Sequence, residues 1–303
     1  MNRIKILFIL SMFFVSVSLA KVTPSDVFVE AKALKIALAS QVIKEKGVSL
    51  LPILDIDLKG ATPSSVYAMG AVLNHKLEVY AKANKKPWKA AIFPNKKITP
   101  ADVKGILLVV QENVRKIFGI SDFQKNSVTG KKPADVMLQL TYANQWLDKL
   151  MPFVKPQYPF ATLKKTEKML DKILNKFSIT PFATNAKKHQ NITPNDVFIN
   201  VTSTYNLLRN IKLTYAKQSS PSHPYNILSA KDKIKPLDIF TITTFNLYFL
   251  YASAVSFGIT DINTTKPLKV IGQIKPNDVF QQSDIVNSKL ANLIAAGGKI
   301  NVK

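Results

Sequence analysis

The stretch Ile98-Thr99-Pro100-Ala101-Asp102-Val103 decides the fold, because variants of it recur seven times along the chain. A threonine before a proline fits a helix N-cap: the hydroxyl accepts an early amide hydrogen bond, and proline at the first helical position lacks only an N–H that would be free anyway. An aspartate two residues after the proline places a carboxylate over the remaining free amides. The copies are centred on Pro24, Pro63, Pro100, Pro133, Pro194, Pro236 and Pro276. Each copy therefore predicts the start of a helix.

Six copies carry an aspartate at the third helical position, and the copy at Pro63 carries Ser65 there. The six are Asp26, Asp102, Asp135, Asp196, Asp238 and Asp278. A catalytic array of carboxylates is the alternative use of such residues. Because capping already accounts for a carboxylate at this position, we interpret all six as structural residues of helix starts.

The residues after each start have helical periodicity. Apolar side chains after Pro100 recur at three- and four-residue spacing up to Gly119, which is a typical residue just past a helix C-terminus. Alternation typical of strands is scarce. The sequence predicts an all-α protein.

The chain also contains an internal duplication. Tyr80-Ala81-Lys82 recurs as Tyr215-Ala216-Lys217, and Phe118-Gly119-Ile120 recurs as Phe257-Gly258-Ile259, in the same order relative to the helix starts. We therefore expect tandem duplicated four-helix bundles, with about eight helices in all: residues 21–152, a Pro-rich linker at 153–159, and residues 160–303. The first helix of the second half is expected over 162–177. A single eight-helix domain or a short α-solenoid is the alternative.

Residues 1–20 have the pattern of a cleaved signal peptide. Arg3 and Lys5 precede an apolar run, and Ser18-Leu19-Ala20 offers the small residues that cleavage requires. The run is shorter than the roughly 20 residues of a membrane-spanning helix. The chain contains no cysteine, which excludes a lipid-modified lipoprotein, disulfides and thiolate metal sites. The sequence predicts a periplasmic or secreted protein.

The net charge of +23 comes almost entirely from lysine. Arginine, whose planar fork suits base and phosphate recognition, occurs only at Arg3, Arg115 and Arg209. We therefore expect no specific nucleic-acid partner, but attraction to an anionic surface. Codon bias in an AT-rich genome is an alternative origin of the lysines.

No residues with the spacing of a catalytic, cofactor or metal site stand out. His75, His189 and His223 form no pair with ligand spacing, and phosphate-binding glycine loops and a nucleophile elbow are missing. We expect neither an enzyme nor a cofactor.

Two long loops at matching places in the halves are the candidate binding loops. The first contains Lys85, Lys86, Trp88, Lys89, Phe93, Lys96 and Lys97, and the second contains Tyr225. An aromatic residue beside proline, surrounded by lysines, suits contact with an anionic surface. The alternative is that the aromatic residues close the open end of each bundle.

The segment from Ile239 to Thr260 contains no charged residue and is long enough to cross a membrane. Its counterpart after Pro100 is plainly amphipathic, so we predict a buried helix that packs on the first half or on a partner chain, which would allow self-association through 239–260.

Together these features predict an exported, soluble helical-repeat binding protein that contacts an anionic membrane, another envelope component or a protein partner. The alternatives are a periplasmic small-molecule-binding module of the sensor type and, third, an enzyme acting on envelope polymers.

Overall fold

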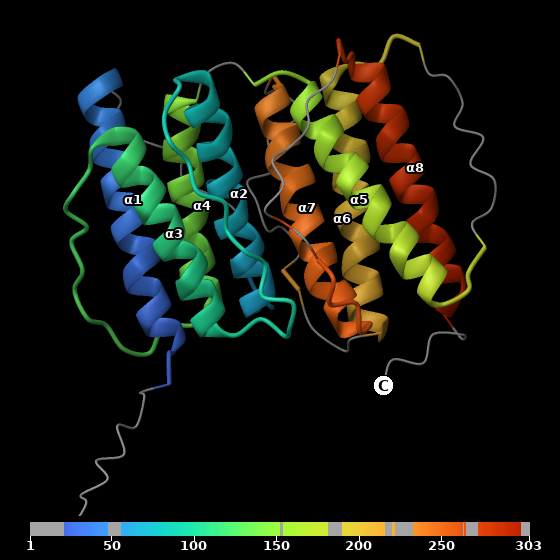
Figure 1. Cartoon of the computed structure of the whole chain (residues 1–303), viewed down its shortest axis with the longest axis horizontal. Helices are drawn as coiled ribbons and strands as arrows, with labels where there is room; N and C mark the ends of the chain where they lie inside the picture. Colours follow the sequence, from blue (N-terminus) through green and yellow to red (C-terminus); the bar gives the residue numbers. More distant parts are fainter. Residues whose placement is uncertain are drawn as a thin grey trace, which may run out of the picture.

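The computed structural model describes residues 21–47, 56–151, 154–180, 190–215, 220–221, 233–262, 264 and 272–297. These residues form helices connected by irregular segments, with no strand among them (Figure 1). The helices are α1 (Pro24–Lys46), α2 (Pro63–Ala83), α3 (Pro100–Phe118), α4 (Pro133–Leu150), α5 (Gln157–Lys176), α6 (Pro194–Tyr215), α7 (Pro236–Ser256) and α8 (Pro276–Ala295). The predicted all-α fold class is confirmed. The signal peptide predicted at 1–20 lies outside the described residues.

Every copy of the start motif opens a helix at its proline. At α3, the backbone N–H of Thr99 donates to Asp102 Oδ2 over 2.9 Å, and Thr99 Oγ1 accepts from the Asp102 amide. Equivalent carboxylates accept from the N-cap amide at 2.7–2.8 Å in the other five aspartate copies. At α2, Ser65 Oγ accepts from the Thr62 amide at 2.9 Å in the same way. The six aspartates thus stand at helix starts and satisfy amides that the helix leaves free.

The helices pack in two groups of four with the same neighbours in each. In the first group α1 packs on α3 and α4, and α2 packs on α3 and α4; in the second, α5 and α6 each pack on α7 and α8. The groups meet mainly where α2 lies against α7 (Figure 1). We call the two groups the first and second bundle.

All four helices of a bundle run in the same direction. The first-turn prolines Pro24, Pro63, Pro100 and Pro133 line one shallow depression, so the four helices of the first bundle begin at the same end. Each connection must therefore return along the bundle by about 30 Å, at 1.5 Å of rise per residue. Figure 1 shows such returns over 84–99 and 119–132. The parallel arrangement of the helices is therefore sufficient to explain the length of these connections.

The second bundle runs in the opposite direction to the first. Its starts share a depression lined by Pro156, Pro159, Pro194, Pro236 and Pro276. The short connection from Leu150 to Gln157 places these starts beside the C-terminal ends of the first bundle (Figure 1).

The predicted linker and the predicted start of α5 need correction. We expected a linker over 153–159 and a helix from 162, but α5 begins at Gln157 and includes Pro159. Proline in the first turn is compatible with a helix because its missing N–H would have no partner there. Residues 152 and 153 lie outside the described part.

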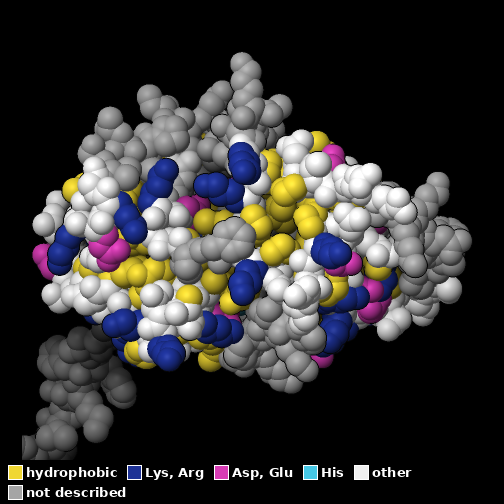
Figure 2. Space-filling model, turned by 90° about the horizontal axis from the view of Figure 1, so that it is seen from above, with side chains coloured by type: hydrophobic (Ala, Val, Ile, Leu, Met, Phe, Trp, Pro, Cys, Tyr) yellow, Lys and Arg dark blue, Asp and Glu magenta, His cyan; other side chains and the backbone are white. Residues whose placement is uncertain are grey.

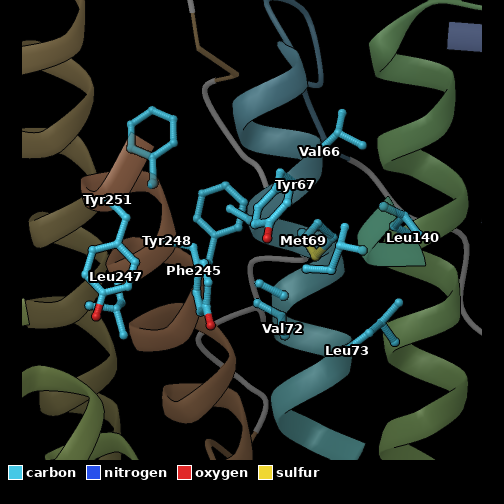
Figure 3. Close-up of a cluster of buried hydrophobic side chains, with 14 of the residues drawn as sticks. Val66, Tyr67, Met69, Val72, Leu73, Leu140, Phe245, Leu247, Tyr248 and Tyr251 are labelled. Carbon is cyan, nitrogen blue, oxygen red and sulfur yellow. The ribbon is translucent and has the colours of Figure 1, made fainter. Parts of the chain in front are cut away.

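The apolar helix α7 is mostly covered by the rest of the chain. By length and composition it is the one described helix that could cross a membrane, but 83% of its apolar window is buried inside the protein. Figure 3 shows Tyr248 of α7 beside α2, where Tyr67 and Val72 lie, and the Tyr248 ring centroid is 6.3 Å from that of Tyr67. The chain's own helices thus cover most of the segment 239–260, for which the sequence also allowed self-association.

Candidate functional site

The return connection over residues 84–99, here called the strap, directs its aromatic side chains inward. Trp88 is half-buried, and its Nε1 donates to the Asn74 carbonyl over 3.1 Å. Phe93 is 1% exposed, and its ring centroid lies 5.5 Å from that of Tyr67 in an edge-to-face contact. The two rings hold the strap on the bundle.

The strap also connects the two bundles. The Phe93 amide donates to Thr264 Oγ1 over 3.0 Å, and this hydroxyl donates to the Ala91 carbonyl over 3.1 Å. The Phe93 ring centroid lies 6.2 Å from that of Tyr248 and 5.7 Å from that of Tyr251, both on α7. The aromatic part of this candidate loop thus closes the junction between the bundles.

The strap lysines are all exposed, but the structure does not bring them together. Lys85 and Lys86 follow the C-terminal end of α2, whereas Lys96 and Lys97 precede the start of α3 at the opposite end of the bundle. Lys89 lies between and pairs with Glu112, with Nζ 2.9 Å from the carboxylate. Lys96 Nζ lies 3.4 Å from Asp102 Oδ1. Tyr225, the candidate in the second half, lies outside the described residues.

A larger group of lysines gathers where the first bundle ends and the second begins. We call this surface the basic end; its members are Lys46, Lys82, Lys85, Lys86, Lys116, Lys149, Lys155, Lys235 and Lys275, all exposed. Figure 2 views this end from above and shows basic side chains around apolar surface. The shared depression of the second bundle, lined only by proline, valine and isoleucine, lies there.

Helix electrostatics explain four of these nine lysines, namely Lys46, Lys82, Lys116 and Lys149. Cations in the last turn of a helix, such as Lys116 and Lys149, complement the negative end of its macrodipole. Lys235 and Lys275 instead occupy the N-cap positions of α7 and α8, where the macrodipole repels a cation. An ammonium group also cannot accept the amide hydrogen bond that threonine accepts at this position. Neither the macrodipole nor a capping hydrogen bond therefore favours lysine at these two sites, although the charge of Lys235 favours the ionised form of Asp238. Lys132 caps α4 in the same way at the other end of the molecule.

A buried polar group between the bundles was not found from the sequence. His75 Nδ1 lies 2.8 Å from Glu78 Oε2, and His75 Nε2 lies 3.0 Å from the Tyr248 hydroxyl of α7. Burial opposes the charged form of Glu78, but hydrogen bonds and charges of His75 and Lys82 outweigh it and lower its pKa to about 2. Burial raises the pKa of Tyr248 well above its usual value. The Glu78 carboxylate, the His75 imidazole and the Tyr248 phenol are hydrogen-bonded in a row, as in a proton-transfer chain. All three side chains are buried, however, and we interpret the row as a contact that joins α2 to α7.

A second ionic contact lies beside the first. Lys76 Nζ, fully buried, lies 2.7 Å from Asp148 Oδ1 of α4. Burial raises the pKa of Asp148 and of Asp238. The positive charge of Lys76 lowers both pKa values and so offsets part of this rise. Lys76 thus joins α2 to α4 through Asp148, and its charge also acts on Asp238 at the start of α7.

Among the described residues, no group of three or more histidine, aspartate or glutamate side chains could hold a metal ion. Comparisons of the chain with protein families, with curated proteins and with solved structures return no match.

Proposed function

We propose that this chain is an exported, non-enzymatic binding protein that associates with an anionic component of the cell envelope through its basic end. The observation that carries this proposal is the placement of Lys235 and Lys275 on helix N-caps, where they oppose the local macrodipole and add to the lysines of the first bundle. The N-terminal sequence supports export, and the lysine excess supports an anionic partner.

Several lysines on one end produce an attraction that no single one would. A lysine near an anionic membrane surface contributes about 1 kcal/mol, and the contributions fall off over a Debye length of about 8 Å at physiological salt. The apolar depression between Pro156, Pro236 and Pro276 adds non-polar contact area at the centre of the same surface. Binding should therefore be strong at low salt and weaken steeply as salt rises.

Sedimentation with lipid vesicles tests the proposal. The mature protein should pellet with vesicles that contain phosphatidylglycerol and stay in solution with pure phosphatidylcholine. Changing Lys149, Lys155, Lys235 and Lys275 together to Gln should weaken binding by at least about tenfold. The same assay with a purified anionic wall polymer distinguishes a lipid from a polysaccharide partner.

The chain offers a matched control at its opposite end. Lys21, Lys59, Lys97 and Lys132 are exposed and lie at or just before the starts of the first-bundle helices, and Lys132 is also an N-cap lysine. Changing these four to Gln removes the same charge, and binding should stay close to that of the parent. Equal losses in both variants would mean that net charge alone causes association and would refute a role for the basic end.

A further inference from the structure

One face of α6 is exposed and uncharged over most of the helix. Its residues are Ile199, Ser203, Asn206, Asn210 and Leu213, here called the α6 stripe, and all five are exposed. Ile199 and Leu213 are 58% and 42% exposed, which places them among the few exposed large hydrophobic residues. The spacing alternates between four and three residues, as in the seam of a coiled coil. A long neutral face is unusual in a chain with 42 lysines and arginines.

The duplication shows what such a face can do. α6 corresponds to α2, because Pro194 corresponds to Pro63 as a helix start. Ser203, Asn206 and Asn210 therefore correspond to Val72, His75 and Val79.

In the first bundle these α2 positions form the contact with α7. His75 binds the Tyr248 hydroxyl, Val79 packs in a cluster with Phe240, and Figure 3 shows Val72 directed toward α7. α6 packs on α7 and α8 through its other faces. The position that α7 occupies on α2 thus has an exposed equivalent on α6.

We infer that the α6 stripe is a dimer interface, at which α6 packs on α6 of a second copy of this chain. The stripe is self-complementary: an asparagine amide both donates and accepts hydrogen bonds, so Asn206 and Asn210 can pair with the same residues of another copy. Asparagine in a seam of this kind also fixes register and the number of helices.

Charge favours a second copy over an acidic partner. An acidic protein would bind preferentially to the lysine-rich surfaces of the molecule, because the α6 stripe contains no cationic side chain. Two copies of a strongly basic chain can approach closely only where neither is charged, and the stripe satisfies this condition. A neighbouring groove between α6 and α8 adds the apolar residues Ile192 and Phe280 at the edge of the stripe, and its lining also includes Asp196, Asn200 and Asn287.

Sedimentation velocity over a wide concentration range tests the inference with the mature chain. The parent should show a monomer–dimer equilibrium. The double variant I199K/L213K should self-associate about tenfold more weakly or not at all. Far-UV circular dichroism and the melting temperature report that the variant is folded.

Two exposed residues outside the stripe provide the control. Ile43 on α1 and Leu108 on α3 are 47% and 44% exposed, so I43K/L108K adds the same charge and removes similar apolar surface. This variant should dimerise like the parent. A parent that stays monomeric up to several hundred micromolar, an unaffected I199K/L213K variant, or equal losses in both variants would overturn the inference. It does not depend on the proposed function, because vesicles are not part of the assay.

Discussion

Replacing Phe93 with alanine should lower the free energy of unfolding by about 3–5 kcal/mol, the usual range for a buried phenylalanine. The side chain is 1% exposed, and a phenylalanine buries roughly 150–250 Å². At about 25 cal/mol per Å², the smaller area alone corresponds to about 4 kcal/mol. The Phe93 ring contacts Tyr67 of the first bundle and Tyr248 and Tyr251 of the second. Removing the ring should therefore also weaken the coupling between the two bundles.

Urea denaturation followed by two signals measures this effect. Trp88 and Trp146 both belong to the first half, so tryptophan fluorescence reports that half, while far-UV circular dichroism reports all helices. In the parent the two transitions should coincide, and in F93A the fluorescence transition should move to lower urea.

The neighbouring Ile92 is the control, because it is 75% exposed on the same strap. Ile92→Ala should change stability by no more than about 0.5 kcal/mol. If F93A costs less than about 1 kcal/mol, or no more than I92A, the strap does not close the junction and the reasoning about its aromatic residues fails.

Two further predictions concern helix starts and one buried cation. Asp102→Ala and Asp196→Ala should each lower stability by about 0.5–2 kcal/mol in thermal denaturation while leaving vesicle binding intact; a variant of parental stability that no longer binds would show that the carboxylate belongs to a site. Lys212 Nζ is buried without a hydrogen-bond partner, 4.4 Å from the centre of the Phe249 ring, and burial lowers its pKa from 10.5 to about 8. Between these two values the unfolded chain binds more protons than the folded one, so the unfolding free energy should rise with pH, by up to about 3 kcal/mol. Lys212→Met should remove this rise in urea titrations at pH 8 and 10, and parallel pH profiles of the two proteins would contradict the assignment.

The helix starts could be predicted from the sequence because capping is local. Every atom that decides the start of α3 lies between Thr99 and Asp102. The direction of each helix is not local, since the same motif suits a parallel or an antiparallel neighbour. The length of the connections could have indicated the direction of the helices. Antiparallel helices need only about 2–8 residues between them, whereas the connection 84–99 is long enough to return along a whole helix and so allows parallel neighbours.

The candidate site was predicted less well than the helix starts, because its geometry depends on contacts between residues that are distant in sequence. Five lysines close together in sequence suggest a cluster, but an extended strap separates Lys85 from Lys97 by the length of a helix. The buried group around His75 left one local sign, the polar residues His75, Glu78 and Lys82 at spacings of three and four on an apolar helix. Its partner Tyr248 is 173 positions away, and nothing in the local sequence indicates that contact.

The parallel course of the helices also determines when the first bundle can form. α1 packs most extensively on α4, and α1 has no substantial contact with α2. The larger part of the apolar face of α1 therefore stays uncovered until the chain has extended through α4, which ends at Leu150. Contacts between residues so distant in sequence slow folding, because a large loop must close before any contact is gained. Under the export that we propose, this delay would keep the N-terminal half unfolded while it crosses the membrane.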